Sequence, residues 1–447
     1  MQIIDSIFLL LLSVVILAII VRDSLKLDPY ILSVRNIFLA GFLLFQTVSA
    51  TITLWTDANE RSIYLSDPGR TGMWFFALCC IFITLFLFAY KHSARLMPSA
   101  FLPSSPRIVS SSKIVFISLF SLTIGVILRF LVSQIPSVGL IAIQVAVGCF
   151  SLACCLLVWE WGKKPYNPIL GVTLLFSVTV SILSLLVNAF GRREILAIFM
   201  CMAWMLFYLK FRLMSAGQLL IRITVWGSLV FIIVLVFSAA RSGKEKDRGI
   251  LEYIQAIANI STQDIEEQLI SGLNGQFAGG ISMWIYETRP IEISYDYFHT
   301  IKYMATLPIP RSFYNEKPNS LGRSLVKEAM ISGVAEDHSL GPGIIGHMIN
   351  DFPWVSIPIY AIGLAIIFRY IDIRAACNCK DPFQIAILGA GVSQIFALSR
   401  GELGQFVILA FCYMTGAWLI VRFSFLFLKN EIYELEDVDN SEDELSQ

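Results

Sequence analysis

The chain has 447 residues, of which 56% are hydrophobic and only 15% are charged, and its mean hydropathy is +0.72. Soluble globular proteins carry about 25% charged residues, so this composition excludes an ordinary soluble enzyme. The apolar residues fall in blocks of membrane-spanning length, which predicts an all-α polytopic integral membrane protein. The net charge is zero and indicates no partner, so the positions of the charges carry the information.

Eleven membrane-spanning helices are expected from these apolar blocks. The blocks are Ile3–Val21, Ile31–Leu54, Met73–Tyr90, Ile114–Val132, Val138–Val158, Ile169–Phe190, Ile195–Phe211, Leu219–Ala240, Trp354–Tyr370, Phe383–Leu398 and Gln405–Leu428. The first block lacks a basic leader and a small-residue cleavage site, so we expect a span and no cleavable signal peptide. The tenth block is short and contains Gly389 and Gly391, which predicts a helix that tilts or breaks beside a cavity.

Basic residues in the short connections set the expected orientation. Thirteen Lys and Arg residues lie in one set of alternating connections and five in the other. The positive-inside rule places the richer set in the cytoplasm of a bacterium, with the N-terminus periplasmic and the C-terminus cytoplasmic. Residues 429–447 form an acidic stretch without apolar periodicity, which predicts a disordered cytoplasmic tail.

Residues 241–352 are the one large break between the apolar blocks, with eight spans in residues 1–240 and three in residues 353–428. Loops beyond roughly 12–15 residues are usually functional or disordered, and this one is too rich in aromatic and aliphatic residues for disorder. We expect a large periplasmic loop that carries much of the chemistry. Its expected features are short helices at Ile250–Ile260, Asp264–Leu273, Phe277–Tyr286 and Ser294–Leu307, extended backbone at Pro308–Pro310, and an irregular stretch from Gly333 to Gly346.

Cationic residues on the predicted periplasmic side are the main chemical signal. The arginine side chain suits bidentate binding of phosphate. Arginines at the periplasmic boundary also run against the positive-inside rule, so their presence there calls for a common explanation. A metal-independent site for a diphosphate is one reason; snorkelling, lipid contact, or pairing with Glu194 and Glu402 is the alternative. The candidate diphosphate-binding residues are Arg192, Arg193, Arg241, Arg289, Arg311, Lys317 and Arg400.

Two histidines on the same side are candidate general bases. His338 follows Asp337, and His347 precedes Asn350 and Asp351, so each imidazole lies near carboxylates and titrates near neutral pH. The alternative is a hydrogen-bonding or capping histidine in a loop. No metal-ligand spacing and no phosphate-binding loop is present, so the sequence predicts no metal, no cofactor and no nucleic-acid partner.

Five short motifs follow one another between residues 170 and 410. They are Asn188-Ala-Phe-Gly191-Arg192-Arg193-Glu194, Phe237-Ser-Ala-Ala-Arg241-Ser-Gly243, Leu307-Pro-Ile-Pro310-Arg311-Ser312-Phe-Tyr-Asn-Glu-Lys317-Pro318, Gly341-Pro-Gly343-Ile-Ile-Gly346-His347 and Leu398-Ser-Arg400-Gly401. In order and content the chain resembles the Wzy-type oligosaccharide repeat-unit polymerases of O-antigen and capsule synthesis. His347 stands where that family would be expected to carry Glu, so a catalytic role at this position does not transfer.

The resemblance implies a GT-C-like glycosyltransferase in the inner membrane. It would polymerise undecaprenyl-diphosphate-linked oligosaccharide repeat units at the periplasmic face. By their own chemistry, the cationic residues are the candidates for binding the leaving diphosphate, and His338 or His347, with Asp337, are the candidates for the base. The implied partners are the lipid-linked oligosaccharide and membrane lipid, with a polysaccharide chain-length regulator as a further candidate. Two alternatives stay open. One is an O-antigen ligase-type glycosyltransferase, and the other is a transporter or flippase for lipid-linked oligosaccharides, which the missing internal repeat disfavours.

Overall fold

The computed structural model of the chain describes most of the apolar blocks and half of the large loop. The described residues are 2–25, 32–56, 63–96, 109–135, 138–186, 192–215, 277–311, 313–329 and 339–427, together with runs of one to three residues between 217 and 261. Every regular element in these ranges is a helix. The prediction of an all-α chain is confirmed for this part.

Eight helical segments within the described ranges are long and apolar enough to cross a membrane. They are α1 (Gln2–Leu25), the continuous run of α2 (Val34–Phe42), η1 (Leu43–Val48) and α3 (Ser49–Thr56), then α4 (Pro68–Ser93), α5 (Ser111–Phe130), α6 (Gly139–Lys163), α7 (Pro168–Leu186), α16 (Pro353–Cys377) and α18 (Leu403–Phe427). This pattern is that of a polytopic membrane protein.

Two more helices coincide with predicted spans but fall short of that standard. They are α8 (Arg192–Leu209), which begins with three charged residues, and α17 (Pro382–Ala397), which has only 16 residues. The predicted span Leu219–Ala240 lies mostly outside the described residues. The count of eleven spans therefore stays a prediction.

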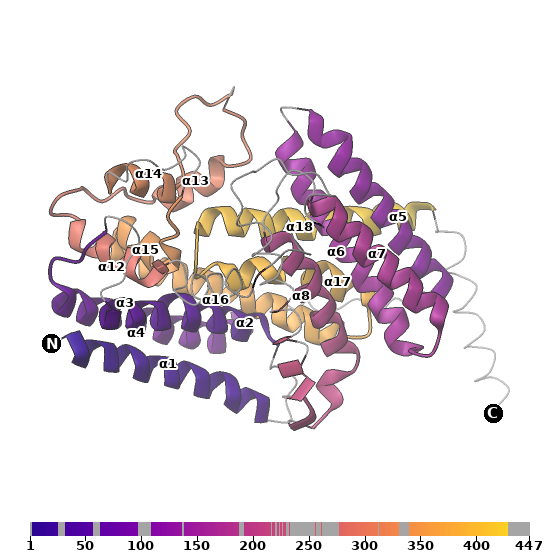
Figure 1. Ribbon diagram of the computed structural model, residues 1–447, viewed down its shortest axis with the longest axis horizontal. Helices are drawn as coiled ribbons and strands as arrows, with labels where there is room; N and C mark the ends of the chain where they lie inside the picture. Colours follow the sequence, from indigo (N-terminus) through magenta and orange to yellow (C-terminus); the bar gives the residue numbers. More distant parts are fainter. Residues whose placement is uncertain are drawn as a thin grey trace.

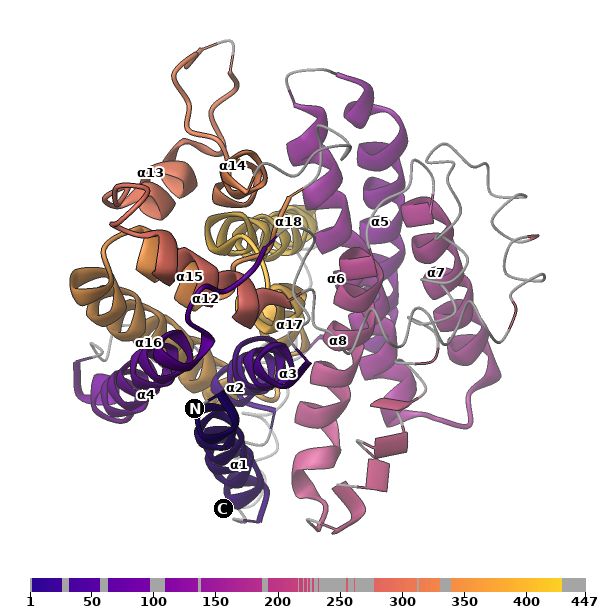
Figure 2. The same cartoon turned by 60° about the vertical axis from the view of Figure 1, so that its left-hand side comes forward.

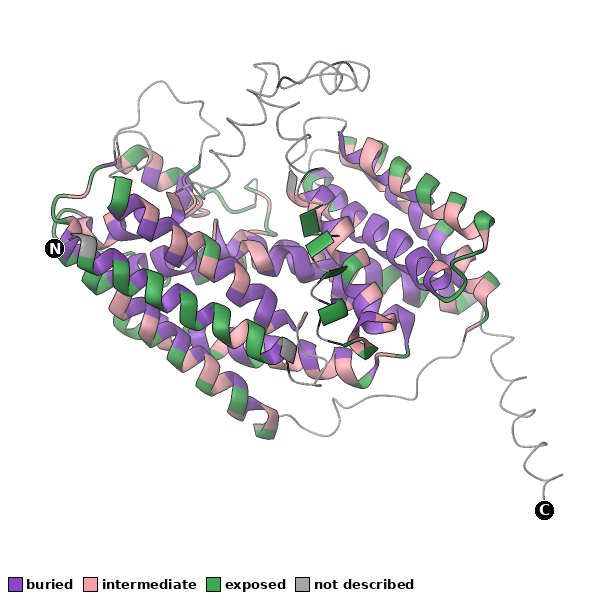
Figure 3. Cartoon of the chain, turned by 60° about the horizontal axis from the view of Figure 1, so that its bottom comes forward, coloured by how far each residue is buried: buried purple, intermediate pink, exposed green. Residues whose placement is uncertain are grey.

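Helix α17 lies at the centre of the bundle and packs against α2, α6, α8 and α18 (Figures 1 and 2). It runs without a break, and glycines allow the close packing, because a Cβ on Gly389 would press on Trp204 and one on Gly391 on Met414. Buried residues line the inward faces of the surrounding helices, while exposed apolar residues cover their outer faces (Figure 3). Such a surface suits lipid contact.

Four short helices of the large loop cover one end of the bundle, here called the capped end (Figure 1). They are α12 (Ala278–Thr288), α13 (His299–Thr306), α14 (Leu321–Glu328) and α15 (Gly343–Asn350). Helix α12 packs against α3, α4 and α15, helix α15 also packs against α16, and α13 packs against α18. The turn between α17 and α18 also lies at the capped end, so the loop helices contact the membrane helices there.

Three expectations for the loop need correction. The helix expected from Ser294 begins only at His299, after Phe298 adopts a left-handed φ of 57°. Pro308 and Ile309 lie in a turn that follows α13, where extended backbone was predicted. The irregular stretch expected up to Gly346 contains the start of α15, whose residues are all buried against α12 and α16. Packing decided that helix, since its glycines and preceding proline gave no local helix signal.

Candidate functional site

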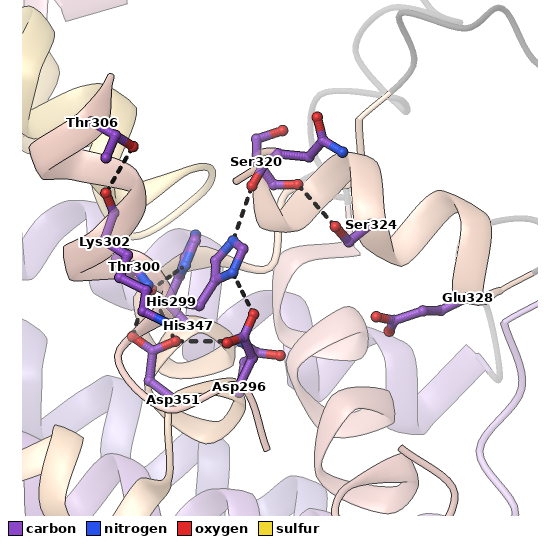
Figure 4. Close-up of polar contacts among 12 residues, drawn as sticks. Asp296, His299, Thr300, Lys302, Thr306, Ser320, Ser324, Glu328, His347 and Asp351 are labelled. Carbon is purple, nitrogen blue, oxygen red and sulfur yellow. Dashed lines mark hydrogen bonds and ion pairs between the residues drawn. The ribbon is translucent and has the colours of Figure 1, made fainter. Parts of the chain in front are cut away.

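A network of polar side chains lies where α13, α14 and α15 meet the α17–α18 turn (Figure 4). Its centre is His347 on α15 and Glu402, the residue before α18, with 3.5 Å between His347 Nε2 and Glu402 Oε2. Both side chains are almost completely buried, at 1% and 6% exposed. Buried titratable groups in contact are uncommon and are candidates for acid–base chemistry.

His347 is a neutral imidazole whose tautomer follows from its partners. The backbone N–H of Leu403 donates to Nε2 at 3.1 Å, so Nε2 is the unprotonated nitrogen. Nδ1 then carries the proton and lies 2.9 Å from the hydroxyl of Thr300. Burial lowers the pKa of His347 to about 3, with a further contribution from His299. The ring therefore orients the start of α18, and it has no free lone pair with which to take a proton from a substrate.

Glu402 is the group in this network that titrates near neutral pH. Burial raises the pKa of Glu402 to about 7. The backbone N–H of Gly322, in the first turn of α14, donates to Oε1, while Oε2 is buried without a hydrogen-bond partner among the described residues. Because Nε2 of His347 carries no proton, Oε2 could bond to it only as a protonated carboxyl, which would share the Nε2 lone pair with the Leu403 N–H.

Asp351 anchors α13 beneath this pair. Its carboxylate accepts the backbone N–H of Thr300 at 3.1 Å and the hydroxyl of Tyr360 at 2.5 Å. Burial raises the pKa of Asp351, and its hydrogen bonds act against this rise. Thr300 therefore bonds to Asp351 through its backbone N–H and to His347 through its hydroxyl, and these contacts fix the orientation of the imidazole ring of His347.

His299 forms a second acid–base pair closer to the surface. Its Nδ1 lies 2.6 Å from the carboxylate of Asp296, and its Nε2 lies 3.0 Å from the carbonyl of Asn319 (Figure 4). Both neighbours are hydrogen-bond acceptors, so the ring links the Asp296 carboxylate to the Asn319 carbonyl. The side chain joins the start of α13 to the segment before α14.

Tyr303 packs on the start of α18 and interacts electrostatically with Glu402 and, separately, with two arginines. Its ring lies over Gly404, where an added Cβ would come within 3.1 Å of it. Burial and then Glu402 raise the pKa of Tyr303 to about 12, while Arg323 and Arg311 act in the opposite direction. The tyrosine thus lies within electrostatic reach of the carboxyl on one side and of two guanidiniums on the other.

The turn after α13 holds two of the predicted diphosphate-binding residues together. The Lys317 ammonium donates to the carbonyls of Leu307 and Ile309 at 2.7 and 2.9 Å, and Arg311 donates to the amide oxygen of Asn319 at 2.7 Å. Burial, and then the neighbouring Arg311, lower the pKa of Lys317. Two cations held beside each other in this way favour a bound anion. Arg311, Lys317 and Arg323 are called the cationic corner below.

The remaining predicted residues lie elsewhere or outside the described residues. Arg289 is buried, and its Nη2 donates to both carboxylate oxygens of Glu328 at 3.1 and 2.9 Å, so its charge is already paired with a carboxylate. Arg193 lies over the ring of Phe406, and Arg400 over that of Phe45, at 5.3 and 5.7 Å. The side chain of Arg192 and the residues Arg241, Asp337 and His338 lie outside the described part of the chain.

The sequence signalled only one of the two central residues of the site. His347 is a predicted candidate base, whereas Glu402 enters the prediction only as a partner for an arginine, and His299 is not among the predicted site residues. One feature could have marked Glu402: it is an acidic residue directly before a span in the predicted periplasmic set, beside Arg400. Among the described residues, no three His, Cys, Asp or Glu side chains are placed to hold a metal ion.

Comparison of the chain with protein-family models, with curated proteins and with solved structures finds no match. The chemistry of the site is therefore argued from its own geometry. A carboxyl that titrates near pH 7 can exchange a proton with a hydroxyl at physiological pH. A cationic corner within electrostatic reach can stabilise negative charge that develops on a leaving group.

Proposed function

We propose that the chain is a membrane glycosyltransferase that polymerises undecaprenyl-diphosphate-linked oligosaccharide repeat units into a surface polysaccharide. The observation that supports this proposal is the buried carboxyl of Glu402 near Tyr303, a tyrosine that also lies within electrostatic reach of Arg311 and Arg323. A transfer from a diphosphate needs a base for the acceptor hydroxyl and cations for the leaving group. Both requirements meet at one end of a membrane helix bundle, where a lipid-linked substrate would present its head group.

In the proposed reaction the acceptor hydroxyl attacks the anomeric carbon of the donor sugar. Its oxygen forms the new glycosidic bond, and its proton passes to Glu402. The bond between the anomeric carbon and the diphosphate oxygen breaks, and the electron pair leaves with the diphosphate. Arg311 and Lys317 stabilise the charge on that group. The products are the elongated glycan on one lipid and a free lipid diphosphate.

Helix α13 is the element that would open to admit the acceptor. It covers Glu402 through Tyr303 and is only eight residues long. Short covering elements commonly open on substrate binding and exclude water once closed. In this proposal the capped end faces the periplasm, the helix bundle is GT-C-like, and a chain-length regulator would bind from the membrane.

The test replaces Glu402 by Gln in a strain that lacks the native chain. Glutamine keeps an oxygen for the Gly322 N–H but cannot accept a proton, so we expect the glycan ladder to collapse to one repeat unit. Glu292→Gln, an exposed carboxylate of the same loop, is the matched control and should give a normal ladder. A normal ladder with Glu402→Gln would refute the proposed base. If Glu402→Gln also lost the single repeat unit attached to the lipid acceptor, the result would favour the ligase reaction. Accumulation of the lipid-linked substrate on the cytoplasmic side would favour transport.

A further inference from the structure

Gln46 is a fully buried polar side chain within a membrane-spanning segment. It belongs to η1, a π-helical turn at Leu43–Val48 between α2 and α3. Single π-helical turns inside α-helices are rare and frequently occur at functional sites. A buried amide also costs free energy unless it is hydrogen-bonded. The partners of this amide therefore indicate what the π-helical turn holds.

The amide of Gln46 joins the membrane helix to the α17–α18 turn and to α12. Its Nε2 donates to the carbonyl of Ser399 at 2.6 Å, three residues before Glu402. Its Oε1 lies 3.5 Å from the hydroxyl of Ser282 on α12, and that hydroxyl donates to the carbonyl of Pro342 at 2.5 Å. One buried side chain thus contacts the turn that carries Glu402 and the serine that holds the start of α15.

Gly343 makes this arrangement possible. It begins α15 with a left-handed φ of 65°, and a Cβ at this position would collide with the Gln46 amide and with the Ser399 carbonyl. Only glycine has both the backbone freedom and the space for this approach. The first residue of α15, the π-helical turn and the α17–α18 turn therefore lie in direct contact.

We propose that Gln46 is a positioning residue that holds the Leu398–Glu402 turn against α15 and so places Glu402 beside His347. The inference rests on the proposed function for its catalytic consequence, because Glu402 is the base there. Other contacts of this turn are the Leu403 N–H on His347, the Glu402 carboxylate on Gly322, and Arg400 over the ring of Phe45. Without the bond from Gln46, the carbonyl of Ser399 would be buried and unsatisfied, and the turn would move toward water.

The first experiment is amide hydrogen exchange on the purified full-length chain in lipid nanodiscs. Gln46→Met keeps the length of the side chain and removes both polar ends. We expect about tenfold faster exchange at the Arg400 and Leu403 amides, the effect of losing one buried hydrogen bond. Thr47→Val is the matched control, because Thr47 is buried in the same π-helical turn but accepts a hydrogen bond from Ser13 of α1 at 2.7 Å. Unchanged exchange in Gln46→Met, or an equal rise in Thr47→Val, would overturn the proposal.

The second experiment is the pH profile of glycan transfer by the same variants. The titratable groups that act on Glu402 are His347 from α15, Tyr303 from α13 and Asp351 before α16, and Arg323 from α14 acts on Tyr303. A turn that takes up water relieves the burial of Glu402, so the acidic limb of the profile should move to lower pH in Gln46→Met, with a lower maximal rate. Thr47→Val should keep the acidic limb of the wild-type chain. A general structural loss in the π-helical turn would lower the rate of both variants without moving this limb in Gln46→Met alone.

Two further outcomes separate the inference from the proposed function. A wild-type chain without transfer activity would refute the function, while the exchange measurement would still decide whether Gln46 holds the turn. Where Gln46→Met does not accumulate in the membrane, Gln46→Leu replaces it, since this variant also lacks the donor to Ser399 and places no ionisable group in the buried site. A wild-type exchange rate at Arg400 in Gln46→Leu would again overturn the inference.

Discussion

The Glu402 carboxyl lies between a neutral imidazole and the first turn of α14, and this environment decides its chemistry. Burial favours the protonated form, while the Gly322 N–H favours the charged form, and burial has the larger effect. His347 supplies no charge at neutral pH because burial lowers its pKa to about 3. A proton can therefore reside on Glu402 near pH 7 without a compensating cation in contact.

The pH dependence of transfer follows from the raised pKa of Glu402. A base must be ionised to act, so the rate should rise through about pH 7 with the loss of one proton and fall away below it. His347 stays neutral over this range and adds no second step. At alkaline pH the rate should fall again, because the lowered pKa of Lys317 brings forward the loss of its charge.

The measurement is the initial rate of lipid-diphosphate release by the purified chain across this range at constant ionic strength. In Glu402→Gln the acidic limb should vanish together with most of the activity. A rate that does not change between weakly acidic and neutral pH would remove Glu402 as the base.

Substitution of Arg311 should affect the transfer rate, whereas substitution of Arg289 should affect the stability of the fold. Arg311 is exposed, so Arg311→Ala should leave the unfolding temperature unchanged, yet it should lower the transfer rate by about 100-fold as a lost charge-stabilising group. Arg289 is buried against Glu328, so Arg289→Ala should destabilise the fold by about 2 kcal/mol because it leaves a partly buried carboxylate unpaired. Thermal unfolding and transfer assays on the same two preparations make the comparison. Full transfer by Arg311→Ala would exclude the cationic corner as the diphosphate site.

Helix α12 shows how the loop is fastened to the membrane helices. Near its C-terminal end, Glu287 accepts three hydrogen bonds. Two come from the turn before α4, from the backbone of Ser66 and Asp67 at 2.7 and 3.0 Å, and one comes from the Thr71 hydroxyl in the first turn of α4 at 2.7 Å. Gly279, near its other end, donates to the hydroxyl of Ser49 on α3. Helix α12 is thereby held at both ends and provides a fixed surface for α15.

Removing the Glu287 carboxylate should loosen this attachment. Glu287→Ala should lower the free energy of unfolding by about 2 kcal/mol, since hydrogen bonds to a charged group are stronger than neutral ones and this carboxylate is only partly buried. Thermal unfolding in nanodiscs measures the change. Glu292→Ala, an exposed carboxylate four residues after α12, is the control and should leave the unfolding temperature unaltered. Equal stability of the two variants would show that α12 is held mainly by apolar contacts.

Hydropathy predicted the membrane helices well because their length and composition are local properties. Predicted Trp354–Tyr370 lies inside α16, and Met73–Tyr90 lies inside α4. The short helices were harder, since α15 starts with glycine and forms through burial. The site was hardest of all, because Glu402 meets a backbone N–H 80 residues away in sequence and no local pattern predicts such a contact. The proximity of Arg311 and Lys317 could be predicted from the sequence, because both residues lie in one short motif.

The whole molecule has two different ends, and this asymmetry sets its expected orientation. The capped end carries α12–α15 and the proposed site (Figure 2). The α16–α17 turn lies at the far end of both helices from the capped end and is flanked by Arg374 and Lys380. Basic residues in short connections favour the cytoplasm. A lipid-linked substrate delivered on the periplasmic side would then reach the capped end.

Thiol labelling tests this orientation with a residue that the chain already has. Cys377, at the end of α16, is exposed, and Phe313 in the cationic-corner turn is 81% exposed. A membrane-impermeant maleimide added to intact spheroplasts should label Phe313→Cys in a Cys377→Ser background, because that turn would face the reagent. Cys377 in the otherwise unchanged chain should react only after the membrane is opened, since the reagent cannot cross the apolar core. The reverse pattern would place the capped end in the cytoplasm, where a periplasmic polymerisation could not occur, and it would refute the proposed function together with the orientation.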